Sequence, residues 1–188
     1  MKTVVTALLL AGICLLGERG VSGAGSLFEK TDVFTAGMEN VCEYRIPSLV
    51  TTDEGTLIAV CDARVEKPGD AINNIDLAMK RSFNNGRTWE PVRILANFPG
   101  QEAAADPCML VDCETDTVWI LYDYILGEPS PNSDRKREQR VIMLHMILSR
   151  DDGQTWSEPI DITTTVKQAG WEAVAAAPGR GIQTRDGR

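Results

Sequence analysis

The chain has 188 residues, of which 43% are hydrophobic and 24% charged, and its formal net charge is −8 at pH 7. This balance is typical of a globular protein and excludes an intrinsically disordered chain. The acidic charge argues against non-specific nucleic-acid binding, which requires a basic face. A short basic run at 135–137 is flanked by acidic residues and prolines, so it indicates a solvated loop rather than a binding patch.

The N-terminus has the pattern of a secretory signal peptide. Lys2 precedes an uncharged run rich in Leu, Val and Ala at 3–16, and small residues follow at 21–25. We therefore expect a signal peptide at 1–23 and an exported chain that functions in an extracellular, periplasmic or lumenal compartment. The apolar run is shorter than the roughly 20 residues that span a bilayer, so no membrane span is expected.

Four cysteines follow the predicted signal peptide: Cys42, Cys61, Cys108 and Cys113. In an oxidising compartment they can form two disulfides with three possible connectivities, and buried free thiols fit the sequence equally well. His145 is the one histidine in the sequence, which excludes a metal site built from several histidines. It lies inside an apolar run, which favours a core or edge-strand position.

Two successive segments show the same pattern of four strands. The first predicts strands at 45–50, 56–61, 75–81 and 89–95, and the second at 106–111, 117–124, 141–150 and 156–162. Their content of Val, Ile, Leu, Trp and Tyr, interrupted by Gly, Asp and Asn, favours strands over helices. No segment shows the sustained 3.6-residue periodicity of a helix.

Each segment carries the same turn sequence between its third and fourth strands: SFNNGRTW at 82–89 and SRDDGQTW at 149–156. We expect Asn84 and Asp151 to bond amides of their turns, and the glycine two residues later to take a positive φ. The tryptophan then folds its ring against the strands. Two unrelated hairpins would not place the motif at the same position of both units, whereas a β-propeller repeats four antiparallel strands with an aromatic motif in each blade.

A third unit begins near the end of the sequence, with a predicted strand at 177–183 and a turn at 185–187. Closed propellers have about four to eight blades. We therefore expect an all-β fold that comprises about two and a half blades, the N-terminal part of a longer propeller. Blade 1 is predicted at about 44–96, blade 2 at about 106–163 and the start of blade 3 at about 171–188.

Blade geometry predicts that four polar residues share one rim. The start of strand one, the end of strand two and the connection between strands two and three lie at the same end of an antiparallel blade. Arg45, Arg64 and Asp70 occupy these places in the first unit, and Asp106 begins the second unit. Guanidinium groups bind carboxylates through paired hydrogen bonds, and a loop acid can donate a proton. The alternative is structural: Arg45 and Asp106 pair with each other or cap strand ends.

These motifs resemble those of sialidases (neuraminidases). Residues 44–47, Tyr-Arg-Ile-Pro, resemble a signature near the start of that family, and SRDDGQTW matches the family's Asp-box, S-x-D-x-G-x-T-W, at every fixed position. SFNNGRTW departs from the Asp-box once, at Asn84. The stretch Asp62-Ala63-Arg64, with Asp70 six residues further on, and residues 178–183 also resemble the family. The Asp-box alone occurs in other secreted propellers, whereas its combination with Arg-Ile-Pro and the Arg64/Asp70 pair is more specific.

The resemblance implies a six-bladed exo-alpha-sialidase that removes terminal sialic acid from glycoproteins, glycolipids or oligosaccharides, with no metal or other cofactor. It implies that Arg45 is one of three arginines that bind the sialic acid carboxylate and that Asp70 is the acid/base. Arg64 and Asp106 would bind the ring substituents. The nucleophile would be a tyrosine activated by a glutamate, with retention of configuration.

The remaining two arginines and the tyrosine–glutamate pair are expected beyond residue 188, because Tyr44, Tyr122 and Tyr124 lie too early in the sequence to match that tyrosine. Residues 1–188 alone are therefore expected to be inactive. Two alternatives fit the same motifs: a non-catalytic propeller that binds sialylated glycans, and a propeller hydrolase for another sugar.

Overall fold

The computed structural model describes residues 30–126, 141–171 and 173–187. The chain divides into two compact units, 1–30 and 31–188, and the strands of the described residues all belong to the second unit. The predicted signal peptide and the loop with the basic run at 135–137 lie outside the described residues. Among the described residues, no helix is long and apolar enough to cross a membrane.

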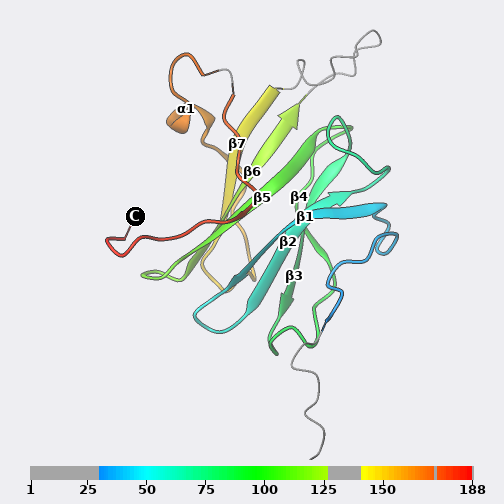
Figure 1. Ribbon diagram of the computed structural model, residues 1–188, viewed down its shortest axis with the longest axis vertical. Coiled ribbons are helices and arrows are strands. Elements are labelled where there is room, and N and C mark those ends of the chain that lie inside the picture. The colour runs from blue at the N-terminus through cyan, green and yellow to red at the C-terminus, as the bar shows by residue number, and fades with distance from the viewer. Residues whose placement is uncertain (1–29, 127–140, 172, 188) are drawn as a thin grey trace, which may run out of the picture. The chain divides into compact units, whose positions relative to one another are not determined.

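The described residues form one nine-stranded sheet and a single helical turn (Figure 1). Blade 1 consists of β1 (Glu43–Thr51), β2 (Leu57–Arg64), β3 (Ile75–Ser82) and β4 (Arg93–Ala96). Blade 2 consists of β5 (Ala103–Asp112), β6 (Thr117–Leu126), β7 (Val141–Ser149) and β8 (Ile160–Asp161). They are followed by α1 (Thr163–Val166) and β9 (Gly179–Arg180). Within each blade, successive strands pair antiparallel.

The first strands of successive units lie side by side. β9 pairs parallel with β5 through Cys108 and Gly179, and the Ser48 hydroxyl of β1 donates to the Gly179 carbonyl oxygen (2.5 Å). The start of the third unit therefore contacts the first strand of both blades. This is the arrangement of inner strands in a propeller, and the predicted fold class, an incomplete all-β propeller, is confirmed.

The fourth strand of each blade is shorter than predicted. β4 begins at Arg93 rather than Trp89, and β8 begins at Ile160 rather than Trp156. Pro91 and Pro159 lie in the missing parts, and a proline has no N–H to donate to the ladder. The tryptophan segments are therefore held by their turns instead of by continuous strand pairing.

The main hydrophobic core joins the two blades. Its buried side chains come from all four strands of blade 1 and from β5, β6 and β7 of blade 2, including Ile58, Met79, Met109, Ile120 and Ile147. Every residue of β2 after Leu57 is buried, as expected for a strand covered on both faces. The junction between the blades is therefore stabilised mainly by burial of apolar surface.

The histidine lies in the core, and the cysteines form no disulfides among the described residues. His145 is buried in β7 and stacks on the Tyr124 ring, with 4.9 Å between ring centroids. All four described cysteines are free: Cys61 is buried, Cys108 is half-buried, and two are exposed at the surface, Cys42 and Cys113. The structure therefore has free thiols rather than disulfides at these four positions, but only Cys61 of the four is buried, as the free-thiol alternative expected.

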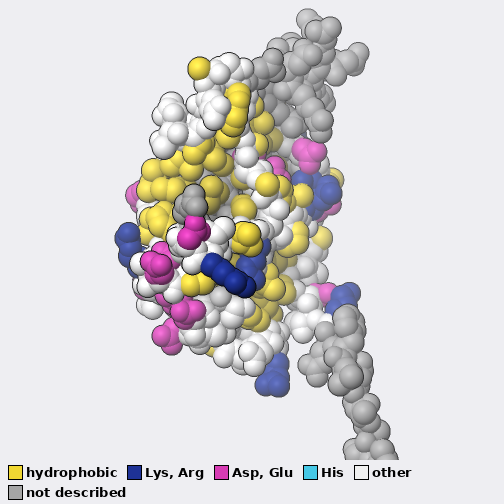
Figure 2. All heavy atoms as spheres, turned by 60° about the vertical axis from the view of Figure 1, so that its left-hand side comes forward, with side chains coloured by type: hydrophobic (Ala, Val, Ile, Leu, Met, Phe, Trp, Pro, Cys, Tyr) yellow, Lys and Arg dark blue, Asp and Glu magenta, His cyan; other side chains and the backbone are white. Residues whose placement is uncertain are grey.

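Several large apolar side chains remain exposed in the last third of the chain. Figure 2 shows hydrophobic side chains gathered in a broad band on one face, with acidic and basic groups along its border. The exposed large apolar residues of this part of the chain include Ile160, Val166, Trp171 and Ile182.

Both Asp-box turns, 82–89 and 149–156, have the predicted geometry. In the second copy, the Asp151 carboxylate accepts the Thr155 N–H (2.8 Å), and the Trp156 indole N–H donates to the Gly153 carbonyl oxygen (3.1 Å). Sequence reasoning did not predict that the Ser149 hydroxyl oxygen accepts the Gly153 N–H (2.9 Å). The first copy repeats all three bonds, so the motif is a self-contained hydrogen-bonded turn.

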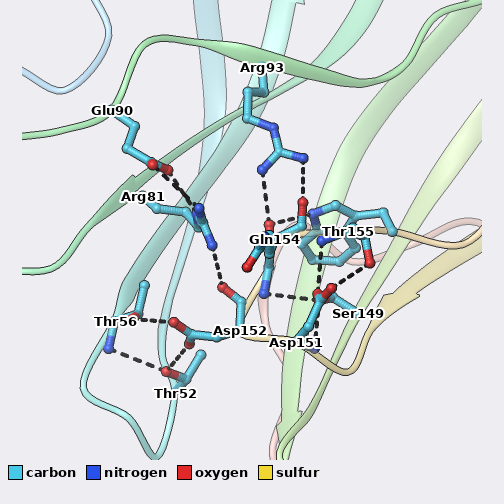
Figure 3. Close-up of polar contacts among 12 residues, drawn as sticks. Thr52, Thr56, Arg81, Glu90, Arg93, Ser149, Asp151, Asp152, Gln154 and Thr155 are labelled. Atoms are coloured by element: carbon cyan, nitrogen blue, oxygen red, sulfur yellow. Dashed lines mark hydrogen bonds and ion pairs between the residues drawn. The ribbon is translucent and has the colours of Figure 1, made fainter.

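The second Asp-box turn also binds blade 1 (Figure 3). The Asp152 carboxylate accepts hydrogen bonds from the hydroxyls of Thr52 (2.6 Å) and Thr56 (2.5 Å), which flank the β1–β2 turn. Arg81 donates to the Asp152 carbonyl oxygen (2.9 Å), and Arg93 donates to the next two carbonyl oxygens (3.1 and 2.8 Å). The turn therefore holds the two blades together as well as closing its own hairpin.

Candidate active site

A pocket of about 200 Å³, called the acidic pocket below, lies where β2 ends and β5 begins. Its lining comes from β2, the β2–β3 loop, β3, β5 and β6: Asp62, Arg64, Asp70, Ala71, Ile75, Ala105, Asp106 and Ile125. The structure therefore brings together three of the four predicted site residues, one of them from the second blade.

Arg64 is the cation of this pocket. Its side chain is 2% exposed, and its guanidinium lies 2.9 Å from the Asp70 carboxylate, 3.4 Å from Glu43 and 3.8 Å from Asp62. A buried guanidinium is stable only with such anionic partners, because its desolvation is costly. The carboxylates of Glu43, Asp62 and Asp70 therefore hold the Arg64 guanidinium in place.

Asp70 is the accessible acid of the pocket. Its side chain is 64% exposed, so a molecule in the pocket can contact it. The loop that carries it is held from inside by the buried Asn73, whose amide group donates to the carbonyl oxygens of Lys67 (2.9 Å) and Gly69 (3.1 Å). An Asn in a Pro- and Gly-containing loop is a recognisable signal for such bonding, but sequence reasoning did not single it out.

Asp106 enters the pocket from a β-bulge at the start of β5. Its φ is +59°, and the pairing with β6 shifts between Ala105 and Cys108. β1 has the same bulge, with Ile46 at φ +54°. A bulge redirects the backbone and side chain at its position, and here it points the Asp106 N–H at the Asp62 carboxylate (2.9 Å).

Asp62 is the buried acid of the pocket, with an exposed fraction of 1%. Burial raises the pKa of its carboxyl to about 7, and the bond from the Asp106 N–H opposes this rise. Burial also raises the pKa of Asp106, which Asp70 raises further and Arg64 lowers. The pocket therefore holds more carboxyl groups than its guanidinium neutralises, and it retains protons at a higher pH than exposed acids do.

Arg45 does not line this pocket. It is exposed on β1 and borders a second, mainly apolar pocket of about 180 Å³ with Phe34, Tyr44, Pro47 and Cys61. In the β1–β2 ladder its Cα lies opposite that of Asp62, so Arg45 lies at the same end of the sheet as the acidic pocket. Arg45 thus lies at the predicted rim but does not line the acidic pocket.

The Asp-box turns lie at the opposite rim. Along the β2–β3 ladder, Arg64 is opposite Ile75 at one end and Leu57 is opposite Ser82, the first Asp-box residue, at the other. At about 3.3 Å per strand residue, these ends are about 23 Å apart. The tryptophan turns therefore cannot contact a molecule in the pocket.

Two tyrosine–glutamate pairs occur in the described residues, and neither lines the acidic pocket. Tyr124 donates to Glu102 (2.6 Å), and this bond raises the pKa of the phenol to about 12. Tyr44 donates to Glu39 (2.9 Å), and burial followed by the Glu39 bond raises its pKa. Because neither phenol lines the acidic pocket, neither is placed to attack a sugar bound there.

No group of three or more His, Cys, Asp or Glu side chains in the described ranges is arranged to hold a metal ion. The polar groups of the pocket are carboxylates arranged around one guanidinium, an arrangement that suits hydroxyl and amide groups of an organic ligand.

Comparison with known proteins gives the family. Residues 46–188 match the BNR repeat-like domain family. The chain belongs to this family. It is 36% identical over 167 residues to a sialidase of Bacteroides fragilis and 32% identical over 177 residues to a sialidase of Micromonospora viridifaciens. These alignments cover 81% and 88% of this BNR-family chain but 30% and 26% of the relatives.

The solved structures that this chain resembles include sialidases, as do its sequence relatives. The BNR-family chain superposes on the Hadza microbial sialidase Hz136 with a TM-score of 0.69 and 38% identity, covering 81% of this chain and 32% of that one. The intramolecular trans-sialidase of Ruminococcus gnavus gives a TM-score of 0.65 at 18% identity, over 81% of this chain and 55% of that one, and shows the shared fold alone. The chain thus spans a third or less of the curated sialidases that it matches at 30% identity or more.

Sequence analysis of this BNR-family chain missed two residues that shape the pocket. Asp62 was noted within the Asp-Ala-Arg motif but was given no role, and Asn73 was not considered. The alternation of side chains along β2 places Asp62 on the same face as Arg64, which is a usable signal. Its bond to Asp106 joins two blades and has no counterpart in the local sequence.

Proposed function

We propose that this chain forms the N-terminal blades of an exo-alpha-sialidase, which releases terminal sialic acid from glycoconjugates with retention of configuration. The observation that carries the proposal is the pocket in which Arg64, Asp70 and Asp106 meet, on the rim opposite the Asp-box turns. Its support from outside the chain is the similarity to sialidases of Bacteroides fragilis and Micromonospora viridifaciens.

Asp70 is the proposed acid/base. As a carboxylic acid it gives its proton to the glycosidic oxygen while the bond from that oxygen to the anomeric carbon breaks. A tyrosine oxygen forms the new bond to the same carbon while its proton passes to the activating glutamate, which gives a covalent intermediate. The Asp70 carboxylate then takes a proton from water, whose oxygen attacks the anomeric carbon, and the displaced tyrosine oxygen regains its proton from the glutamate. The exposed side chain of Asp70 suits this contact with substrate and water.

The other residues bind the substrate. We assign Arg45 to the sialic acid carboxylate, since a guanidinium forms paired hydrogen bonds with a carboxylate. Arg64 and Asp106 are assigned to polar ring substituents, which they can bind as donor and acceptor. A tyrosine nucleophile suits an anionic sugar, because a carboxylate nucleophile would repel the substrate's own charge.

The proposal places the tyrosine nucleophile, its glutamate and two further arginines outside residues 1–188, because neither tyrosine–glutamate pair of the described residues lines the pocket. Catalysis by residues 1–188 alone is therefore not expected. The proposed substrates are sialylated glycoproteins, glycolipids and oligosaccharides, and the proposed compartment is outside the cytosol, on the strength of the N-terminal 1–23 sequence.

The test is the dependence of the Asp70→Asn effect on the leaving group, measured in the full-length protein. Protonation matters most for a poor leaving group, so hydrolysis of sialyllactose should fall by about 10²–10⁴-fold, and hydrolysis of a 4-methylumbelliferyl sialoside much less. Asp53→Asn, in an exposed turn on the opposite rim, is the matched control and should leave both rates unchanged. Equal losses for the two substrates would remove Asp70 from the proposed role.

The same assay separates the alternatives. Binding of sialylated glycans without release of sialic acid by the wild-type protein would indicate a glycan-binding propeller. Release of a different sugar from a panel of aryl glycosides would indicate another hydrolase.

A further inference from the structure

The Asp62 carboxylate lies between the two blades that form the acidic pocket and faces a residue of each. One oxygen of its carboxylate accepts the backbone N–H of Asp106 at the start of blade 2 (2.9 Å). The other oxygen lies 3.8 Å from the Arg64 guanidinium in blade 1. A single residue, 1% exposed, therefore lies against both the pocket's cation and an acid from the next blade.

Arg64 depends on such partners for its orientation. Its two terminal nitrogens face Glu43, Asp62 and Asp70, while its buried Nε has no hydrogen-bond partner among the described residues. Asp70 is exposed and belongs to a loop, whereas Asp62 belongs to a buried strand. Asp62 is thus the rigid partner of this guanidinium, and side chains held by buried partners are positioned more accurately.

The next blade provides an internal comparison. Asp123 lies opposite Ala105 in the β5–β6 ladder, as Asp62 lies opposite Arg45 in the β1–β2 ladder, and both pairs come directly before the bulge. The Asp123 carboxylate likewise accepts a backbone N–H of the following unit, that of Ala176 (2.7 Å), and is 3% exposed. The described residues include no cation within 4 Å of Asp123, whereas Asp62 faces Arg64.

The two acids therefore share one feature and differ in another. Both bind the start of the next inner strand, which is a structural function repeated from blade to blade. Both also lie near Asp106, but only Asp62 lies near Arg64 and Asp70 as well.

We propose that Asp62 is a positioning residue of the active site, which holds the Arg64 guanidinium and the Asp106 backbone at the separation that the substrate requires. This inference rests on the proposed function of the pocket. Asp62 itself takes no part in bond making or breaking. Its effect is to preorganise the donor and the acceptor, so that they need not reorganise when substrate binds.

The test compares Asp62→Asn with Asp123→Asn in the full-length protein at pH 8, where the Asp62 carboxyl is ionised. An Asn oxygen can still accept the N–H of the next strand, so both variants should keep this junction. Asp62→Asn also removes the charge that faces Arg64. Its kcat/KM for the methylumbelliferyl sialoside should fall about tenfold or more, mainly through KM, whereas that of Asp123→Asn should change less than twofold.

Equal kinetic effects of the two variants would overturn the proposal, because they would mean that the carboxylate acts only through the blade junction. A loss confined to kcat would overturn it too, since it would indicate a direct part in the chemical step. The unfolding midpoints of both variants, measured in urea, show whether any difference reflects stability instead.

A second measurement does not depend on activity. Hydrogen exchange in the peptide that covers β5 should accelerate at Asp106 in Asp62→Ala and stay as in the wild type in Asp123→Ala. Unchanged exchange in Asp62→Ala would overturn the positioning role. If the wild type cleaves no sialoside but this pattern of exchange is found, the proposed function fails while the geometric part of the inference stands.

Discussion

Arg81 of blade 1 donates a hydrogen bond to the backbone carbonyl oxygen of Asp152 in blade 2 (2.9 Å). The same guanidinium is paired with Glu90 of its own blade (2.8 Å), so it is held in place while it reaches across the junction. Asp152 also binds two threonine hydroxyls of blade 1 through its carboxylate. The variable position of the second Asp-box, between its fixed Asp and Gly, is therefore a contact between blades (Figure 3).

Replacing Asp152 with alanine should destabilise the junction. The Thr52 and Thr56 hydroxyls lose a charged acceptor, and hydrogen bonds to charged groups contribute about 1.5–3 kcal/mol each, less where water can replace the lost partner. We expect the free energy of unfolding in urea to fall by about 2 kcal/mol. Asn85→Ala is the matched control, since Asn85 has nearly the same φ (57° against 59°) and its side chain forms no hydrogen bond among the described residues. Equal losses in the two variants would refute the contact between blades.

The two Asp-box glycines should respond differently to alanine. Gly86 and Gly153 both have positive φ, 79° and 74°, so alanine carries a similar backbone cost of about 1–2 kcal/mol at each. A Cβ on Gly153 would lie 2.8 Å from Ile58 Cδ1 of blade 1, whereas a Cβ on Gly86 would have its nearest neighbour at 3.5 Å. Gly153→Ala should therefore lose about 1–3 kcal/mol more than Gly86→Ala in urea unfolding. A loss no larger than that of Gly86→Ala would mean that the junction relaxes around the added methyl group.

The stability of the fold should decrease as pH rises towards neutrality. Burial raises the pKa of both Asp62 and Asp123 to about 7, from an ordinary value of 3.8. Between these values the folded state keeps protons that the unfolded state has released, so the free energy of unfolding falls with rising pH and levels off above about pH 7. Each carboxyl contributes at most about 1.4 kcal/mol per pH unit.

Asp123→Asn isolates one of these two carboxyls, because an amide does not titrate. Urea unfolding of this variant from pH 5 to pH 8 should show a shallower decline than that of the wild type. Asp53→Asn removes an exposed acid instead and serves as the control. A decline as steep in Asp123→Asn as in the wild type would show that Asp123 does not retain its proton in the folded state.

The four described cysteines should react with a thiol reagent in an order set by their burial. Cys42 and Cys113 are exposed and should be labelled first. Cys61 is 2% exposed, and burial raises the pKa of its thiol, so it should react only when the structure opens. Burial also raises the pKa of Cys108, which should react at an intermediate rate. Mass spectrometry of the labelled peptides measures this order, and native protein without reactive Cys42 and Cys113 would contradict the free-thiol arrangement.

Much of the architecture could be predicted from the sequence because it is local. The strands follow from runs of β-branched and aromatic residues, and each Asp-box contains its own serine, acid or amide, glycine and tryptophan within eight residues. The predicted starts of β4 and β8 were wrong for a reason that is also local, since Pro91 and Pro159 interrupt the ladder. Because an antiparallel blade returns the chain to the same end every second strand, the common rim of Arg64, Asp70 and Asp106 followed from the strand order.

Contacts between blades were decided by the tertiary structure alone. Thr56 and Asp152 are separated by 96 positions in the sequence, and Asp62 and Asp106 come from different repeats, so neither pairing leaves a local pattern. Arg45 borders the apolar pocket of Phe34 and Tyr44 rather than the acidic pocket, and this placement likewise leaves no local pattern. Side-by-side packing of the blades also buries the Asp62 carboxyl, and it is this loss of solvent that raises its pKa. The sequence by itself determined which strands and turns form, and the packing of one blade on the next decided which charges meet.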